Sequence, residues 1–149
     1  VGVTVNVVKS VTDSTELSLS GSVVDAKVSS GALEGNDVPL VAQYNTRLGL
    51  SQRLCESLSG LLEWQAVGER ASSGDFNNDF EPLAAYSVLN AALHWTQGDH
   101  QLTLRVNNLL NEEYSEFGAI GYRPVTYEQD EAFQPSPEIN GSLNWRYSF

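Results

Sequence analysis

The feature that most constrains the fold is a period-two alternation of apolar and polar residues, which recurs along almost the whole chain. In its last stretch, the apolar positions are Leu143, Trp145, Tyr147 and Phe149, and the positions between them are polar. Successive side chains of a β-strand point to opposite faces, so this pattern indicates strands with one apolar and one polar face. Helical periodicity is almost absent, and the chain is predicted to be all-β.

The alternation divides the chain into seven strand candidates. Most of them are about 9–13 residues long, whereas strands of water-soluble proteins have a mode of about 5–6 residues and membrane-crossing strands need about 9–11. The candidates therefore have the length of membrane-crossing strands. Their clearest parts are residues 1–7, 17–23, 43–51, 57–66, 89–95, 102–107 and 139–149.

The connections between these strands alternate between short and long. Short polar turns lie around Asp13, around Glu56 and at 97–99. Short turns at one end and long loops at the other are typical of outer-membrane barrels. The expected long loops are residues 29–40, 69–84 and 111–137.

Acidic side chains are concentrated in and beside the long connections. The formal net charge is −11, and these segments hold 13 of the 19 carboxylates but only two arginines, Arg70 and Arg123. We therefore expect one strongly acidic end. A nucleic-acid partner is disfavoured, because binding phosphates requires clustered Lys and Arg.

No group of residues in the sequence forms a catalytic motif. His94 lies among the polar positions of a strand and has no accompanying nucleophile motif, so neither enzymatic activity nor a cofactor is expected. Oxygen-bearing side chains stand at every second position of 75–81, as in a calcium loop. The segment lacks that loop's glycine and its bidentate glutamate, so we expect a solvated acidic loop and no metal site.

Alternation alone permits two opposite arrangements of the strand faces. In a membrane barrel the apolar faces meet lipid and the polar faces line the lumen, whereas in a soluble β-sandwich the apolar faces pack together. Aromatic residues near the strand ends favour the barrel, because such residues form girdles at membrane interfaces. Two alternatives stay open: a secreted or periplasmic β-sandwich binding module, and an eight-stranded barrel that lacks its first strand. In the barrel, the lumen-facing candidates are Arg47, Glu63, Gln65, Arg105, Asn107 and Arg146.

Three stretches carry a resemblance to a known family. Residues 105–114 read RVNNLLNEEY, residues 135–141 read PSPEING, and DAK at 25–27 is followed by GNDVPLV at 35–41. These stretches resemble the penultimate-strand, last-strand-entry and upstream motifs of TonB-dependent outer-membrane receptors. Glu138 and Ile139 depart from the Gly-Arg usual in that family.

The resemblance implies an antiparallel transmembrane β-barrel of 22 strands, of which residues 1–149 would form about the last seven. The plug domain and the TonB-contacting segment would lie upstream of Val1. Such a receptor sits in the bacterial outer membrane and takes up a scarce small-molecule ligand, most often a ferric siderophore or a similar iron chelate. Partners implied by the resemblance are the upstream plug and remaining barrel strands, outer-membrane lipid and the barrel-assembly machinery.

The resemblance also assigns expected roles to particular residues. The six lumen-facing candidates would contact the plug or the ligand. Leu143, Trp145, Tyr147 and Phe149 would form the carboxy-terminal signature by which barrels are recognised for insertion.

Overall fold

The computed structural model describes residues 1–149, and all its regular elements are β-strands. It contains no helix long and apolar enough to span a membrane. The strands are β1 (Gly2–Thr12), β2 (Thr15–Val24), β3 (Tyr44–Cys55), β4 (Leu58–Val67), β5 (Tyr86–Gln97), β6 (His100–Asn107), β7 (Ser115–Tyr122), β8 (Gln129–Pro135) and β9 (Asn140–Tyr147).

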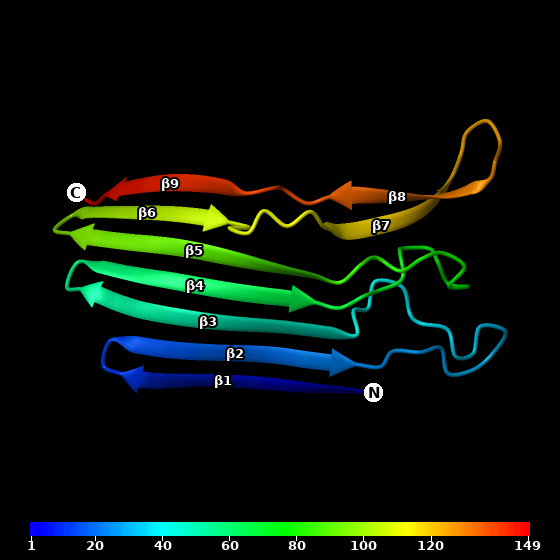
Figure 1. Ribbon diagram of the computed structural model, residues 1–149, viewed down its shortest axis with the longest axis horizontal. Helices are drawn as coiled ribbons and strands as arrows, with labels where there is room; N and C mark the ends of the chain where they lie inside the picture. Colours follow the sequence, from blue (N-terminus) through cyan, green and yellow to red (C-terminus); the bar gives the residue numbers. More distant parts are fainter.

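Seven of these strands form one antiparallel sheet in the order β1-β2-β3-β4-β5-β6-β9 (Figure 1). Each strand pairs with its neighbour in sequence, except that β9 pairs with β6 across the intervening hairpin. β1 and β9 lie at opposite edges and do not pair, so the sheet is open. The predicted all-β, antiparallel architecture with seven strands in the main sheet is confirmed.

Strand length and connection length also follow the prediction. The seven strands contain between 8 and 12 residues each. Three tight turns lie at one end of the sheet, here called the short-turn end, and the long connections all lie at the other, here called the long-loop end (Figure 1).

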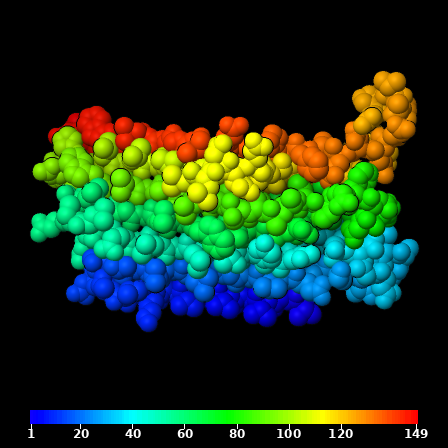
Figure 2. Space-filling view, in the orientation of Figure 1, coloured from blue at the N-terminus to red at the C-terminus, as the bar shows by residue number.

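The expected loop at 111–137 is only partly a loop. It contains a second, two-stranded sheet made of β7 and β8, which lie roughly in line with β6 and β9 (Figure 1). The turn between β7 and β8 stands out from the rest of the surface in Figure 2. Alternation missed this hairpin because Gly118 and Gly121 interrupt the pattern and both Ala119 and Ile120 are apolar.

The main sheet is a single layer, and the β-sandwich alternative is therefore wrong. Only 13 of the 149 residues are buried. Leu48 on β3 remains 44% exposed and Leu104 on β6 43% exposed, because no second sheet covers their face. In a sandwich these side chains would form the dry core between two sheets.

The few buried residues gather where strands meet the long-loop end. Val67, Tyr86 and Val88 form a small cluster against which Ala42 and Tyr114 pack. The Tyr86 and Tyr114 rings stack with centroids 4.3 Å apart. The long connections thus pack against the strand ends, and the buried contacts of the structure are concentrated at the long-loop end.

Candidate functional site

All six lumen-facing candidates lie on one face of the main sheet. The pairing register places Ser20 opposite Arg47, Arg47 opposite Gln65, and Arg105 opposite both Ala92 and Ser142. Glu63, Asn107 and Arg146 share that face because each lies an even number of residues from one of these positions. We call this side the polar face. The opposite, apolar face carries rows such as Leu19-Leu48-Trp64-Leu89.

Three of the six candidates form one cluster. The Arg47 side chain lies 3.7 Å from a Glu63 carboxylate oxygen (Nε to Oε2) and donates from Nη2 to Gln65 Oε1 at 3.3 Å. Arg47 is about half exposed, so the pair contributes little to stability. The cluster therefore presents charged and amide groups that remain accessible to a partner.

The other three candidates lie apart from this cluster, on β6 and β9. Asn107 donates from Nδ2 to Asn140 Oδ1 at 3.0 Å, which ties the two strands together. Arg105 and Arg146 make no side-chain hydrogen bond or ion pair. Both are free to bind an anionic group.

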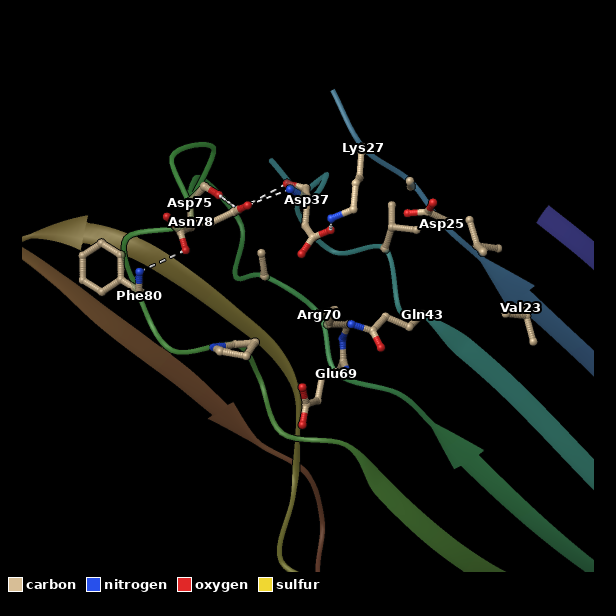
Figure 3. A pocket seen from close by; sticks show the side chains of 15 residues that line it. Val23, Asp25, Lys27, Asp37, Gln43, Glu69, Arg70, Asp75, Asn78 and Phe80 are labelled. Carbon is tan, nitrogen blue, oxygen red and sulfur yellow. Dashed lines mark hydrogen bonds and ion pairs between the residues drawn. The ribbon is translucent and has the colours of Figure 1, made fainter. Parts of the chain in front are cut away.

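A cavity of about 500 Å³ lies at the long-loop end, between the connection that follows β2 and the connection that follows β4 (Figure 3). Its charged lining consists of Asp25, Lys27, Asp37, Glu69, Arg70 and Asp75. Four of these six are acidic, which agrees with the acidic end expected from the sequence. None of the six lumen-facing candidates lines this cavity.

Beside the cavity, an ion pair closes the connection after β2, and an asparagine joins this connection to the one after β4. Lys27 Nζ lies 2.7 Å from Asp37 Oδ1, and this hydrogen bond and the negative charge raise the pKa of Lys27. The Asp37 backbone N–H donates to Asn78 Oδ1 at 2.6 Å, while Asn78 Nδ2 donates to the carbonyl oxygens of Asp37 and Asp75. Asp37 and Asn78, which are 41 positions apart in sequence, are thereby held together (Figure 3).

Asp75 is buried, contrary to the solvated acidic loop expected at 75–81. It is 4% exposed, and its carboxylate accepts hydrogen bonds from the backbone N–H groups of Asp79 (2.9 Å) and Phe80 (3.3 Å). An aspartate that bonds to its own backbone a few residues ahead stabilises a turn. The buried Asp75 carboxylate therefore stabilises the turn of this loop, while Asp79 and Glu81 remain on the surface.

Arg70 joins the cavity wall to the β7–β8 hairpin. Its guanidinium donates to the carbonyl oxygens of Ser115 (3.1 Å) and Glu116 (2.6 Å) and lies 5.6 Å from the Tyr86 ring centroid. Only 8% of the residue is exposed, and no carboxylate pairs with it. Burial also raises the pKa of the Tyr114 hydroxyl, which belongs to the same packed region.

Asn108 fixes the passage from β6 to the hairpin. It has a positive φ of 52°, is 2% exposed, and bonds through its side chain to Glu112 N, Glu112 O and Pro137 O. Asn tolerates this left-handed backbone better than most residues. In the sequence, Asn108 is notable only as part of the stretch 105–114. The signal for its structural role is a polar residue directly after a strand.

Comparison with known proteins identifies the fold. No protein-family model and no curated protein sequence matches the chain. Among solved structures, the ferric yersiniabactin uptake receptor FyuA from Yersinia pestis matches with a TM-score of 0.81 and 19% identity over 99% of this chain. This chain has the fold of a receptor barrel wall.

Two further structures agree. The siderophore receptor PiuA from Acinetobacter baumannii matches 98% of the chain with a TM-score of 0.79 and 13% identity. BauA, the ferric preacinetobactin receptor of the same organism, matches 99% with a TM-score of 0.68 and 18% identity. The chain spans 23%, 21% and 22% of the length of FyuA, PiuA and BauA, respectively. The resemblance to TonB-dependent receptors is thereby confirmed at the level of the fold.

Proposed function

We propose that residues 1–149 form the carboxy-terminal part of the barrel of a TonB-dependent receptor in a bacterial outer membrane. The receptor would take up a scarce ligand, and the ligand class we propose is a ferric siderophore or a similar iron chelate. This part would supply barrel wall, extracellular loops and the signal for barrel insertion. The plug, the TonB-contacting segment and the remaining strands would come from the rest of the receptor.

One observation carries this proposal. The three solved structures reported above are all siderophore receptors, and each superposes on at least 98% of the chain. The chemistry of the two faces supports it independently. A single sheet with an exposed apolar face suits contact with lipid, because alternation in membrane barrels places apolar side chains outward and polar ones toward the lumen.

The polar face supplies the groups that would meet the plug or the ligand. The cluster of Arg47, Glu63 and Gln65 offers a cation, an anion and an amide within a few ångströms. Arg105 and Arg146 are unpaired cations on the same face. Such groups favour a hydrated partner with carboxylate or amide edges, which fits both a folded plug and a polar chelate.

The cavity at the long-loop end would gather ligand from outside. Apart from the Lys27–Asp37 ion pair, its lining carries three carboxylates and one cation, Arg70, so its net charge is negative. This favours ligands that bring positive charge or hydrogen-bond donors. Net charge acts mainly on the rate of encounter, so it selects a broad class and not one ligand.

The last strand supports the insertion role. Leu143, Trp145 and Tyr147 alternate on the apolar face of β9, and the Phe149 ring meets the Tyr147 ring edge-on at 5.1 Å. This is an exposed apolar and aromatic stripe at the edge of the sheet. A barrel-assembly machinery that pairs with edge strands could recognise it.

Partitioning between water and detergent or lipid vesicles, followed by circular dichroism, tests the membrane placement. We expect β-structure only in detergent or lipid, and aggregation in plain buffer. A soluble monomer with a cooperative melt in water would overturn the proposal.

For the ligand, binding of ferric chelates to the complete receptor in detergent would be followed by fluorescence, with Arg47→Gln and Arg105→Gln as variants. Unchanged affinity in both variants would exclude these side chains as ligand contacts.

A further inference from the structure

The apolar face is hollowed at one place near its β1 edge. A groove of about 540 Å³ lies there, within the range of about 300–1,000 Å³ typical of small-molecule sites. Its lining is almost wholly apolar and crosses five strands, from β1 to β5. Representative lining residues are Val7, Leu19, Leu48, Leu62 and Trp64, together with one charged residue, Lys9.

Lys9 is the single formally charged side chain on the apolar face of the main sheet. The register places it opposite Leu17, in the row that continues through Leu50 and Leu62. Of the other seven Lys and Arg residues, Lys27, Arg70 and Arg123 lie in the long connections, and four lie on the polar face: Arg47, Arg53, Arg105 and Arg146.

The ammonium group of Lys9 has no partner within residues 1–149. Lys9 is exposed and takes part in no side-chain hydrogen bond or ion pair, whereas Lys27 is paired with Asp37. A charged side chain on a lipid-facing surface is costly near the bilayer centre and is retained where it reaches the headgroup layer. Lys9 lies four residues before the Asp13 turn, on the part of β1 nearer the short-turn end.

We propose that the groove and Lys9 together bind one anionic phospholipid of the leaflet at the short-turn end. An acyl chain would occupy the groove, and the phosphate group would bind the Lys9 ammonium. Long basic side chains at membrane interfaces lie along the apolar surface and extend their charge to the headgroups. A single cation beside an apolar groove matches an amphiphile with one anionic head, and the charge complementarity favours such a lipid over a zwitterionic one.

This inference rests on the membrane placement proposed above, and its test separates the two. Trp64 lines the groove, so acyl chains that carry bromine quench its fluorescence when they occupy it. Trp95 and Trp145 also lie on the apolar face and would be replaced by phenylalanine, leaving Trp64 as the only tryptophan. The protein would be reconstituted in phosphatidylcholine vesicles with increasing brominated phosphatidylglycerol, and in parallel with brominated phosphatidylcholine.

We expect phosphatidylglycerol to quench Trp64 with about fivefold preference over phosphatidylcholine, the size of effect that one basic residue near an anionic surface gives. Lys9→Gln should bring this preference close to one. Arg53→Gln is the matched control, because it removes the same charge near the same end but from the polar face, where Arg53 donates to the Asp13 carbonyl oxygen. It should leave the preference unchanged. Added glycerol phosphate should not compete, because it has no acyl chain for the groove.

The outcomes distinguish the lipid site, a site for the phosphate group alone and the membrane placement. No preference in the Lys9 protein, an undiminished preference in Lys9→Gln, or an equal loss in Arg53→Gln would overturn the lipid site. Competition by glycerol phosphate would replace it with a site for the phosphate group alone. Quenching by brominated phosphatidylcholine reports membrane insertion whatever the headgroup, so its absence would instead overturn the membrane placement.

Discussion

The opposite chemistry of the two faces makes a sharp prediction for two adjacent residues of β2. Leu19 lies on the apolar face between Val7 and Leu48, and Ser18 lies on the polar face between Val8 and Gly49. Replacing each by arginine introduces the same charged side chain at nearly the same depth. Leu19→Arg and Ser18→Arg place this side chain on opposite faces of the sheet.

The expected magnitudes follow from the environment of each side chain. Leu19 is near the middle of its strand, and an arginine facing lipid at the bilayer midplane costs about 2–4 kcal/mol. At Ser18 the opposing residue is Gly49, which leaves room for a longer side chain, and Glu16 offers a carboxylate on the same face. We therefore expect a cost near zero at Ser18. The difference corresponds to a change of about 30-fold to about 700-fold in the folding equilibrium, at about 1.4 kcal/mol per tenfold.

The assay is denaturant unfolding of the protein refolded into phosphatidylcholine vesicles, followed by circular dichroism for both variants. The slope with denaturant should be unchanged, so that the shift of the midpoint reports stability. The reasoning is refuted if Ser18→Arg costs as much as Leu19→Arg, because the polar face would then not be hydrated. It is also refuted if Leu19→Arg is tolerated in lipid, because that face would then not be lipid-exposed.

Three more predictions concern the long-loop end. Gly118→Val should destabilise the β7–β8 hairpin by about 1–3 kcal/mol, because a Cβ at Gly118 would lie 2.7 Å from Ser72 Oγ and 3.2 Å from Leu83 Cδ2. The expected result is faster proteolysis at the hairpin turn, and an unchanged proteolysis rate would contradict the prediction. Asn108→Ala should cost about 1–3 kcal/mol in unfolding free energy, because three side-chain hydrogen bonds are lost from a buried site. Asn108→Asp should cost at least as much in denaturant unfolding at neutral pH, because it keeps the acceptor for Glu112 N but places a buried carboxylate oxygen against the Glu112 and Pro137 carbonyl oxygens. The Arg123 guanidinium bonds to Asp130 and holds the pKa of that carboxyl below its usual value. The ion pair therefore helps to stabilise the hairpin at neutral pH, and this contribution is lost as the pH falls through the lowered pKa. Arg123→Gln should raise the Asp130 pKa toward its ordinary value in an NMR titration, and an unmoved pKa would show that the pair has no influence.

Alternation predicted the main sheet well because its physical cause is local. The two faces of each strand have different surroundings. Every second residue points to the same face, so these residues share one kind of surroundings and tend to be of one chemical type. The rows Leu19-Leu48-Trp64 and Ser20-Arg47-Gln65 show how the separate strand patterns combine once the register is set. The hairpin of β7 and β8 has no such regular surroundings, because one side packs on Ser72 and Leu83 and the other faces solvent. Its sequence therefore carries little periodicity.

The residues that hold the long-loop end could not be found in the same way. Arg70 and Asp75 lie in segments expected to be loops, and Asn108 lies in the stretch that resembles a family motif, yet each is less than a tenth exposed. Their hydrogen-bond partners are mostly backbone groups from distant or irregular segments, and no sequence period encodes these. A buried polar group must be satisfied by some partner, but the sequence does not say which segment supplies it.

These buried polar contacts have a consequence for how a ligand would meet the cavity. Loops that hold binding groups are often mobile, and ordering them on binding reduces affinity. Here the connection after β2 is tied to the connection after β4 through Asp37 and Asn78, and the latter connection is tied to the hairpin through Arg70. Asp75 fixes the loop between these attachments from within. The acidic cavity is therefore a preformed surface, so a ligand that fits it would pay little ordering entropy, and substitutions at the ties should weaken binding without touching the ligand.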